Sequence, residues 1–361
     1  MAFSSHLAEL DAFFRRDGAN DFDPSNSGDG GSDASNAAQT SAGFGAQTTA
    51  GLLSIQVDLS GASTPAAAKP RENLGQTIIG SAGGLRFDLI WDNSVASAPA
   101  GYKSAIEDAA QFYTKIFSNN DLITVHVGWG EVDGQSLGAN ALGENIANMV
   151  SEKYATVYNA LQSDHGSSSQ QAQADSTLPT TNPLPNTYFS VSYAQAQAWG
   201  VLSPDSRRND GWMGLANYSE LGGGSTWDFS PTSTPGGNQY DAVTTAEHEL
   251  SELMGRYSNV RNYDGYGSYT ALDLFRYSAP GVRDLKSNNG PAYFSIDNGA
   301  HHLGYYNNDP NNGDLGDWIS SVEDNSYGDG YPGMISPVTK NDLIEDAVLG
   351  YNLTADGKRV I

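Results

Sequence analysis

Residues 244–256, with the sequence T-T-A-E-H-E-L-S-E-L-M-G-R, restrict the fold of this chain more than any other segment. Five apolar residues in and just before this segment recur at helical spacing and predict an amphipathic helix that buries one face against a sheet. They are Val243, Ala246, Leu250, Leu253 and Met254. Asp241 is a suitable N-cap before this apolar stripe, and Gly255 suits the position after its end. His248 and Glu252, four residues apart, project together from the helix and are available for chemistry.

The core of this segment, H-E-L-S-E from His248 to Glu252, resembles the H-E-x-x-H helix of zinc metalloproteases. In those enzymes the two histidines bind the metal and the glutamate activates its water. The resemblance implies that His248 is a metal ligand and Glu249 the general base. Glu252 replaces the second histidine, and since a carboxylate can ligate zinc we expect Glu252 as the second ligand. The alternative is a solvated acidic helix without a metal.

Further segments extend the resemblance to the metzincin class of metalloproteases. Gly255 falls where metzincins keep the glycine of H-E-x-x-H-x-x-G-x-x-H, although Ser258 stands in place of the third histidine. Residues 333–337 (G-M-I-S-P) resemble the methionine turn, which implies that Met334 lies under the site; ordinary packing there is the alternative. H-E-L-S-E-L-M-G-R is also similar to a group of uncharacterised bacterial proteins assigned as metalloproteases. The similarity covers about residues 85–351 and implies an α+β, metzincin-like fold.

A catalytic zinc needs a third protein ligand, and four residues downstream of the helix are candidates. They are Asp264, Asp273, His301 and His302. Asp273 follows Glu252 by 21 residues, a spacing similar to that of the ligand glutamate in thermolysin-like proteases. It also stands among large apolar residues, where an unpaired carboxylate is costly. We therefore expect Asp273 to complete the site, with a salt bridge to Arg276 or Arg283 as the alternative.

These residues predict metal-assisted peptide hydrolysis. The metal would lower the pKa of its water, and Glu249 would accept the proton as the water attacks a peptide carbonyl. Tyr257, Arg276 and Tyr277 are the candidate donors to the oxyanion. With one nitrogen and two carboxylates as ligands, zinc is the first expectation, and manganese, iron and calcium are more credible than at a histidine-rich site.

The composition excludes several classes of partner and site. A net charge of -24 argues against nucleic acid and anionic membranes, and no apolar run approaches membrane-spanning length. No cysteine is present, so neither a disulfide nor a thiolate zinc site can form. The richness in Gly, Asn, Ser and Tyr suits a secreted protein, and the N-terminus lacks the features of a cleaved signal peptide. The expected partner is a protein or peptide substrate.

Three regions are expected along the chain. Residues 1–50 read as a disordered Gly/Ser-rich leader with a short N-terminal helix, and residues 51–84 as a strand (52–59) and a spacer. Residues 85–361 read as one domain, with an upper part (85–255) containing a mixed twisted sheet and two or three helices, and an irregular lower part (256–361) with a C-terminal helix. Strands are predicted at 85–91, 122–129, 211–217 (at a sheet edge) and 293–297, helices at 102–117, 145–161, 192–199 and 341–349, and a polar loop at 166–186.

Two other function classes are compatible with the sequence. The chain could be a secreted binding or surface protein with a metalloprotease-like fold and no catalysis. It could also be a structural protein stabilised by calcium. The oxygen ligands would then come from the acidic loop residues Asp309, Asp314, Asp317, Asp324 and Asp329. No G-x-S-x-G elbow indicates a serine hydrolase.

Overall fold

The structure is a computed structural model of the whole chain. It describes residues 73–361 with gaps at 139–140, 164–167, 185–186, 206, 261–268, 287–289, 310–312 and 320–324. The leader and the strand expected at 52–59 lie outside the described residues, as does Asp264. All described residues belong to one compact unit, residues 47–361.

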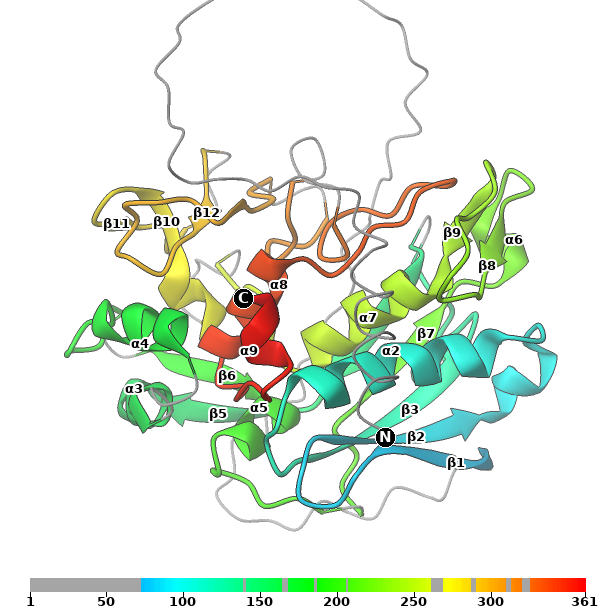
Figure 1. Ribbon diagram of the computed structural model, residues 1–361, viewed down its shortest axis with the longest axis horizontal. Coiled ribbons are helices and arrows are strands. Elements are labelled where there is room, and N and C mark those ends of the chain that lie inside the picture. The colour runs from blue at the N-terminus through cyan, green and yellow to red at the C-terminus, as the bar shows by residue number, and fades with distance from the viewer. Residues whose placement is uncertain are drawn as a thin grey trace, which may run out of the picture. The chain divides into compact units, whose positions relative to one another are not determined.

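The largest element is a five-stranded mixed sheet in the order β1-β2-β3-β7-β4 (Figure 1). Its strands are β1 (Asn73–Gly80), β2 (Arg86–Asp92), β3 (Leu122–Trp129), β7 (Gly211–Leu215) and β4 (Gly143–Ala147). The central strands β2, β3 and β7 are parallel, whereas β1 and β4 run antiparallel at the two edges. The fold is therefore mixed α+β with a mixed sheet, as the sequence predicts.

Two helices, α2 (Tyr102–Ile116) and α7 (Ala242–Leu253), lie against each other on one face of this sheet (Figure 1). The larger apolar residues of α2 (Ile106, Phe112, Tyr113 and Ile116) are buried, and so is the predicted apolar stripe of α7. The Tyr113 hydroxyl of α2 donates to the Glu247 carbonyl oxygen of α7 at 2.8 Å. This packing fixes the rotation of α7 about its axis. It therefore determines how His248 and Glu252 are oriented relative to the sheet edge.

The remaining described elements are short. The strands are β5 (Met149–Lys153), β6 (Tyr188–Ser192), β8 (Thr226–Asp228), β9 (Gln239–Asp241), β10 (Arg276–Ala279), β11 (Val282–Arg283), β12 (Tyr293–Phe294) and β13 (Gly304–Tyr305). The helices are η1 (Asn93–Ser97), α3 (Tyr154–Ser163), α4 (Ser169–Ser176), α5 (Tyr193–Ala198), α6 (Tyr218–Leu221), η2 (Leu272–Phe275), α8 (Lys340–Val348) and α9 (Gly357–Val360). After α7 the chain is mostly irregular, apart from the small sheet β11-β10-β12-β13 and the closing helices.

The structure corrects four predictions of local structure. Residues 145–161 are not one helix, because β4 and β5 occupy most of the first half and α3 begins only at Tyr154. The predicted loop at 166–186 contains α4, and the predicted spacer before residue 85 contains β1. The segment expected at a sheet edge, β7, lies inside the sheet between β3 and β4. The edge next to α7 is β4 instead.

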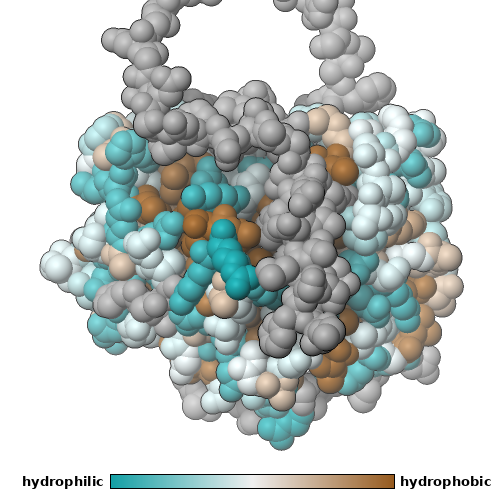
Figure 2. Space-filling view, viewed as in Figure 1, coloured by the Kyte–Doolittle hydropathy of each residue, from teal (hydrophilic) through white to brown (hydrophobic). Residues whose placement is uncertain are grey.

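None of the described helices is both long and apolar enough to cross a membrane. On the face shown in Figure 2, the described residues present polar side chains with small apolar areas between them.

Candidate metal centre

Helix α7 begins and ends where its sequence predicts. The Asp241 carboxylate accepts hydrogen bonds from the backbone N–H groups of Val243 and Thr244 at 3.0 and 3.2 Å, which makes it the N-cap. Gly255 follows the C-cap Met254 with a φ of 115°, a conformation that favours glycine. A Cβ at this position would also lie 2.8 Å from the Gln195 side chain. The chain can therefore turn sharply after Met254 and run back towards the polar face of α7.

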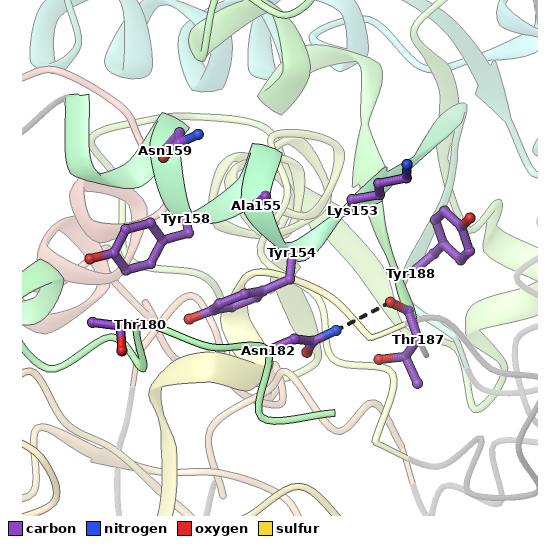
Figure 3. Close-up of a pocket in the computed structure, with 9 residues that line it drawn as sticks. All are labelled: Lys153, Tyr154, Ala155, Tyr158, Asn159, Thr180, Asn182, Thr187 and Tyr188. Atoms are coloured by element: carbon purple, nitrogen blue, oxygen red, sulfur yellow. Dashed lines mark hydrogen bonds between the residues drawn. The ribbon is translucent and has the colours of Figure 1, made fainter. Parts of the chain in front are cut away.

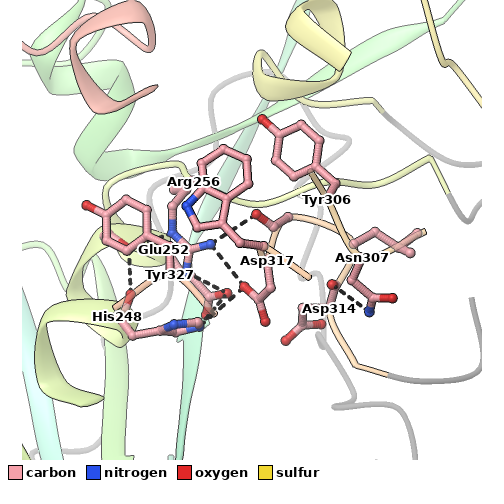
Figure 4. Close-up of polar contacts among 12 residues, drawn as sticks. His248, Glu252, Arg256, Tyr306, Asn307, Asp314, Asp317 and Tyr327 are labelled. Atoms are coloured by element: carbon pink, nitrogen blue, oxygen red, sulfur yellow. Dashed lines mark hydrogen bonds and ion pairs between the residues drawn. The ribbon is translucent and has the colours of Figure 1, made fainter. Parts of the chain in front are cut away.

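His248, Glu252 and Asp317 form a group of side chains able to hold a metal ion. One ligand atom from each of the three lies within 4.8 Å of the others, and no second such group occurs among the residues that the structure describes. His248 and Glu252 come from α7, whereas Asp317 comes from the irregular segment before α8. The three side chains point toward one another (Figure 4).

The imidazole of His248 is oriented for metal binding. Its Nδ1 lies 2.7 Å from the carbonyl oxygen of Ser326, which fixes Nδ1 as the donor in the neutral ring. Its other nitrogen, Nε2, faces the carboxylates of Glu252 and Asp317. A metal-binding histidine usually has its second nitrogen held in this way by a carbonyl or carboxylate. The Ser326 hydroxyl donates to the Thr244 carbonyl oxygen at 2.9 Å and ties this backbone to α7.

The donor atoms of this group lie close together. The Nε2 atom of His248 lies 3.4 Å from Glu252 Oε1 and 3.4 Å from Asp317 Oδ1. Four donors in a tetrahedron around a metal ion at the usual zinc–ligand distances are about 3.3–3.5 Å apart. The two spacings from Nε2 are therefore compatible with a bound metal ion, and they also allow an ion pair between His248 and the two carboxylates.

The guanidinium of Arg256 contacts both carboxylates of this group. Its Nη1 lies 3.0 Å from Asp317 Oδ1 and its Nη2 lies 3.3 Å from Glu252 Oε1. The side chain is fully buried, donates to the Ser251 hydroxyl at 2.7 Å and stacks 4.3 Å from the ring of Tyr327. Arg256 thus offsets one of the two negative charges and holds the two acids side by side.

Glu249 lies next to the metal-binding group. The side-chain amide of Asn145, in edge strand β4, donates to the Glu249 carboxylate at 2.8 Å and also to the Glu252 carboxylate. One amide therefore joins the predicted general base to a predicted ligand. A Cβ at Gly143, two residues earlier in β4, would lie 2.5 Å from Glu249 Oε1. A side chain at this position would force the Glu249 carboxylate to shift.

The site shifts the pKa values of its own groups. Burial, and then the charge of Glu252, raise the pKa of Glu249 to about 8. Burial alone would lower the pKa of His248, but the nearby carboxylates, Asp317 foremost, hold it well above its usual value. Burial likewise works to raise the pKa of Asp317, yet His248 and Arg256 lower it overall. A group with a pKa near neutrality is well suited to accept and return a proton.

Asp317 is positioned by its buried neighbour. The Trp318 ring is 1% exposed and stacks on Tyr306, with the ring centroids 4.8 Å apart. The Trp318 backbone N–H donates to the Tyr327 carbonyl oxygen at 2.8 Å, and the Asp317 carbonyl oxygen accepts from the Asn307 N–H at 2.7 Å. These contacts fix the backbone on both sides of the carboxylate.

The structure does not place Asp273 in this group, which corrects the predicted third ligand. Its carboxylate accepts hydrogen bonds from the Ser258 hydroxyl at 2.6 Å and from the backbone N–H groups of Thr270 and Asn259 at 2.8 and 3.3 Å. Asp273 is fully buried, as its apolar neighbours suggest. These donors stabilise the buried carboxylate, so Asp273 organises the chain after α7, and Asp317 is the acid that lies beside His248 and Glu252.

The predicted oxyanion donors are engaged away from the group. The Tyr257 hydroxyl donates to the Ser190 carbonyl oxygen at 3.0 Å, in β6. The Arg276 guanidinium is fully buried, donates to the Leu315 carbonyl oxygen and stacks on Tyr306. The Tyr277 hydroxyl faces Thr177 at 3.5 Å. Tyr257 and Tyr277 therefore join the lower part of the fold to the upper part, and Arg276 makes its contacts within the lower part, in place of the role predicted for the three residues.

The remaining candidates also lie apart from the group. His301 is exposed and pairs with Asp297 at 2.5 Å, and His302 contacts Tyr305. Met334 is 38% exposed, so it does not lie under the site as the resemblance implies. Tyr327 takes that place, with its ring edge-on to His248 at 6.5 Å.

Of the acidic loop residues considered for calcium, Asp317 belongs to the metal-binding group and Asp324 lies outside the described residues. Asp309, Asp314 and Asp329 form no metal-binding group with other described residues.

No protein-family model, no curated protein and no solved structure matches this chain. Its function is therefore inferred from the geometry of the candidate centre and from the resemblance of its motif.

Proposed function

We propose that this chain is a metal-dependent endopeptidase. The observation that carries the proposal is the convergence of His248 Nε2, Glu252 Oε1 and Asp317 Oδ1, with Nδ1 of the histidine already fixed by a carbonyl. The order of strand, helix, strands, motif helix, irregular segment and closing helix is compatible with the metzincin-like arrangement that the motif suggests.

His248, Glu252 and Asp317 would hold the ion, and zinc is the first choice, with manganese and iron next for one nitrogen and two oxygens. When bound, such an ion lowers the pKa of water towards neutrality. Glu249 would accept the proton from the attacking water and pass it to the leaving amine. Asn145 would keep the Glu249 carboxylate in place during both transfers.

A polypeptide substrate suits the edge of the sheet. Strand β4 pairs with β7 on one side, and no described strand pairs with its other side. An extended peptide can add to such an edge by backbone hydrogen bonds. Because Asn145 of β4 contacts Glu249, a peptide on this edge would place its carbonyl groups beside the general base.

Arg256 supports a second candidate. Its guanidinium already pairs with Glu252 and Asp317, so the group could be a permanent ion-pair network in a catalytically inactive binding or surface protein. The two candidates predict different metal contents.

The deciding experiment measures metal content and cleavage together. The full chain is purified without added metal, its metal content is determined by mass spectrometry, and casein digestion is followed with and without a chelator. Near-stoichiometric zinc with chelator-sensitive cleavage supports the endopeptidase. Metal without cleavage supports a metal site but not a peptidase, and neither metal nor cleavage supports the ion-pair network of an inactive binding or surface protein.

A further inference from the structure

A second candidate site lies in a pocket of about 800 Å³ that shares no residue with the metal-binding group. It is formed by the end of β5, the start of α3 and the segment leading into β6 (Figure 3). We call it the tyrosine pocket. The side chains that define it are Lys153, Tyr154, Tyr158, Asn159, Asn182 and Tyr188.

Local structure places these side chains together. Lys153 and Tyr188 are direct partners in the antiparallel pair β5–β6, so their side chains lie on the same face of the ladder. Tyr154 and Tyr158 are four residues apart in α3 and share one side of that helix. The Tyr154 hydroxyl donates to the Pro179 carbonyl oxygen, which fixes this buried ring.

The pocket offers aromatic faces beside amide and hydroxyl groups. A tyrosine ring provides an apolar face with a polar tip, and an asparagine amide provides both donors and acceptors. The Asn159 amide has no hydrogen bond to any described residue, and Tyr188 is 51% exposed. A sugar ring has matching groups, because its C–H face can lie on an aromatic ring while its hydroxyls meet amides.

The positive charge of Lys153 favours acidic sugars over neutral ones. Lys153 is exposed and forms no ion pair with any described residue, and none of the residues lining the pocket is acidic. The net charge of -24 argues against polyanionic ligands for the chain as a whole, and the lack of acidic residues around Lys153 makes this pocket a local exception. A ligand that carries a carboxylate would therefore be favoured over a neutral one.

Figure 3 shows Tyr158 and Tyr188 on opposite sides of the pocket, with Tyr154 and Asn182 between them. A ligand that reaches both outer tyrosines has to be extended. We propose that the tyrosine pocket binds a segment of an acidic polysaccharide, with sugar rings against the tyrosines and a uronic acid carboxylate at Lys153. The site would attach the protein to such a polymer independently of any catalysis at the metal centre.

The test is calorimetric titration of the full chain with a short oligogalacturonate, a neutral cello-oligosaccharide of equal length and an oligoglutamate peptide. The oligogalacturonate should bind more tightly than the neutral sugar. Tyr188→Ala should weaken both sugars by about 2- to 10-fold through the lost aromatic contact. Lys153→Met should weaken only the oligogalacturonate, by about 2- to 5-fold, as expected for one exposed ion pair.

The matched control is Tyr218→Ala, which removes a tyrosine of similar exposure, 45%, from α6 and should leave binding unchanged. Absence of saturable binding to either sugar would overturn the proposal, as would sugar binding that survives both pocket variants. Binding of oligoglutamate that is lost in Tyr188→Ala would also overturn it and indicate a peptide site. Chelator-treated protein should bind equally well, so the outcome is separate from that of the peptidase assay.

Discussion

The Arg256 guanidinium and the Asp317 carboxylate form a buried ion pair, with Nη1 3.0 Å from Oδ1. The same guanidinium lies 3.3 Å from Glu252, so one arginine pairs with two of the three proposed metal ligands. Two carboxylates close together repel each other unless a cation lies nearby. Arg256 supplies this cation within the chain, and it can keep the ligands assembled before a metal arrives.

Arg256→Met should therefore destabilise the metal-free protein. Removing one partner of a buried ion pair leaves an uncompensated charge and costs about 3–5 kcal/mol of unfolding free energy. Zinc would take over the missing positive charge, so adding zinc should raise the Tm of the variant more than that of the original chain. Urea titration and thermal melts with and without zinc measure both effects.

The comparison variant is Arg207→Met, which removes an exposed pair with Asp205 and should leave the stability almost unchanged. A metal-free Arg256→Met protein as stable as the original would show that the arginine does not compensate the two acids.

Asp317→Ala should empty the metal centre, whereas Asp273→Ala should not. Losing even a supporting group around a metal costs about 10- to 100-fold in affinity, so losing Asp317 should cost at least about 100-fold. Asp273→Ala should keep the metal but lower the unfolding free energy by about 2–4 kcal/mol, because buried donors lose their acceptor.

Metal titration by competition with a chromophoric chelator distinguishes these two residues. His301→Ala serves as the control for a histidine outside the group. Loss of metal in Asp273→Ala with retention in Asp317→Ala would reverse the assignment.

The sequence predicted α7 well because local signals agree there. The apolar stripe, the Asp241 cap and Gly255 each indicate the same helix, and burial and backbone geometry confirm them. His248 and Glu252 lie together for the same reason, since four residues in a helix determine their spacing. Contacts within one helix are readable from spacing alone.

The third ligand could not be chosen in this way, because it depends on contacts far apart in the chain. Asp273 and Asp317 both have large apolar neighbours, so burial is expected for either. The two residues differ in the groups that surround their carboxylates. Ser258 and Thr270 donate hydrogen bonds to Asp273, whereas Arg256 and His248 lie beside Asp317. Trp318, a large buried residue directly after Asp317, was the signal that its loop is anchored.

Asn145 was missed for a different reason. The segment around it was predicted as helix, because edge strand β4 is half-buried along most of its length and shows no clear alternation. Its role depends on sheet order, which brings β4 beside α7.

The metal-free protein should lose stability as the pH rises from about 4 to about 8. Burial raises the pKa of Asp342 to about 6 and that of Asp346 to about 8, from an ordinary value of 3.8 for each. In that range the folded chain keeps protons that the unfolded chain has released, so raising the pH favours unfolding. Thermal melts in the presence of a chelator across this range measure the slope.

Asp346→Asn isolates one of these groups. The amide oxygen can still accept the hydrogen bond from Tyr327, which the carboxylate receives at 2.6 Å. The variant should be more stable than the original chain by about 1–3 kcal/mol above pH 8, since no buried charge forms. Near pH 4 the difference should vanish. A control at the surface, Asp356→Asn, should leave the slope unchanged, and an unchanged slope in Asp346→Asn would refute the assignment.

Glu249→Gln tests the chemical step itself. Glutamine has nearly the same shape, and its amide oxygen can accept the Asn145 hydrogen bond that the carboxylate receives at 2.8 Å. It cannot take a proton from water, so casein cleavage should fall by about 100- to 10,000-fold, the usual contribution of a general base. Metal content should stay unchanged, because His248, Glu252 and Asp317 are intact.

The control variant Glu152→Gln, in β5, should cleave normally. Near-normal cleavage by Glu249→Gln would show that Glu249 is not the general base. Loss of metal in that variant would show that Glu249 is a metal ligand instead.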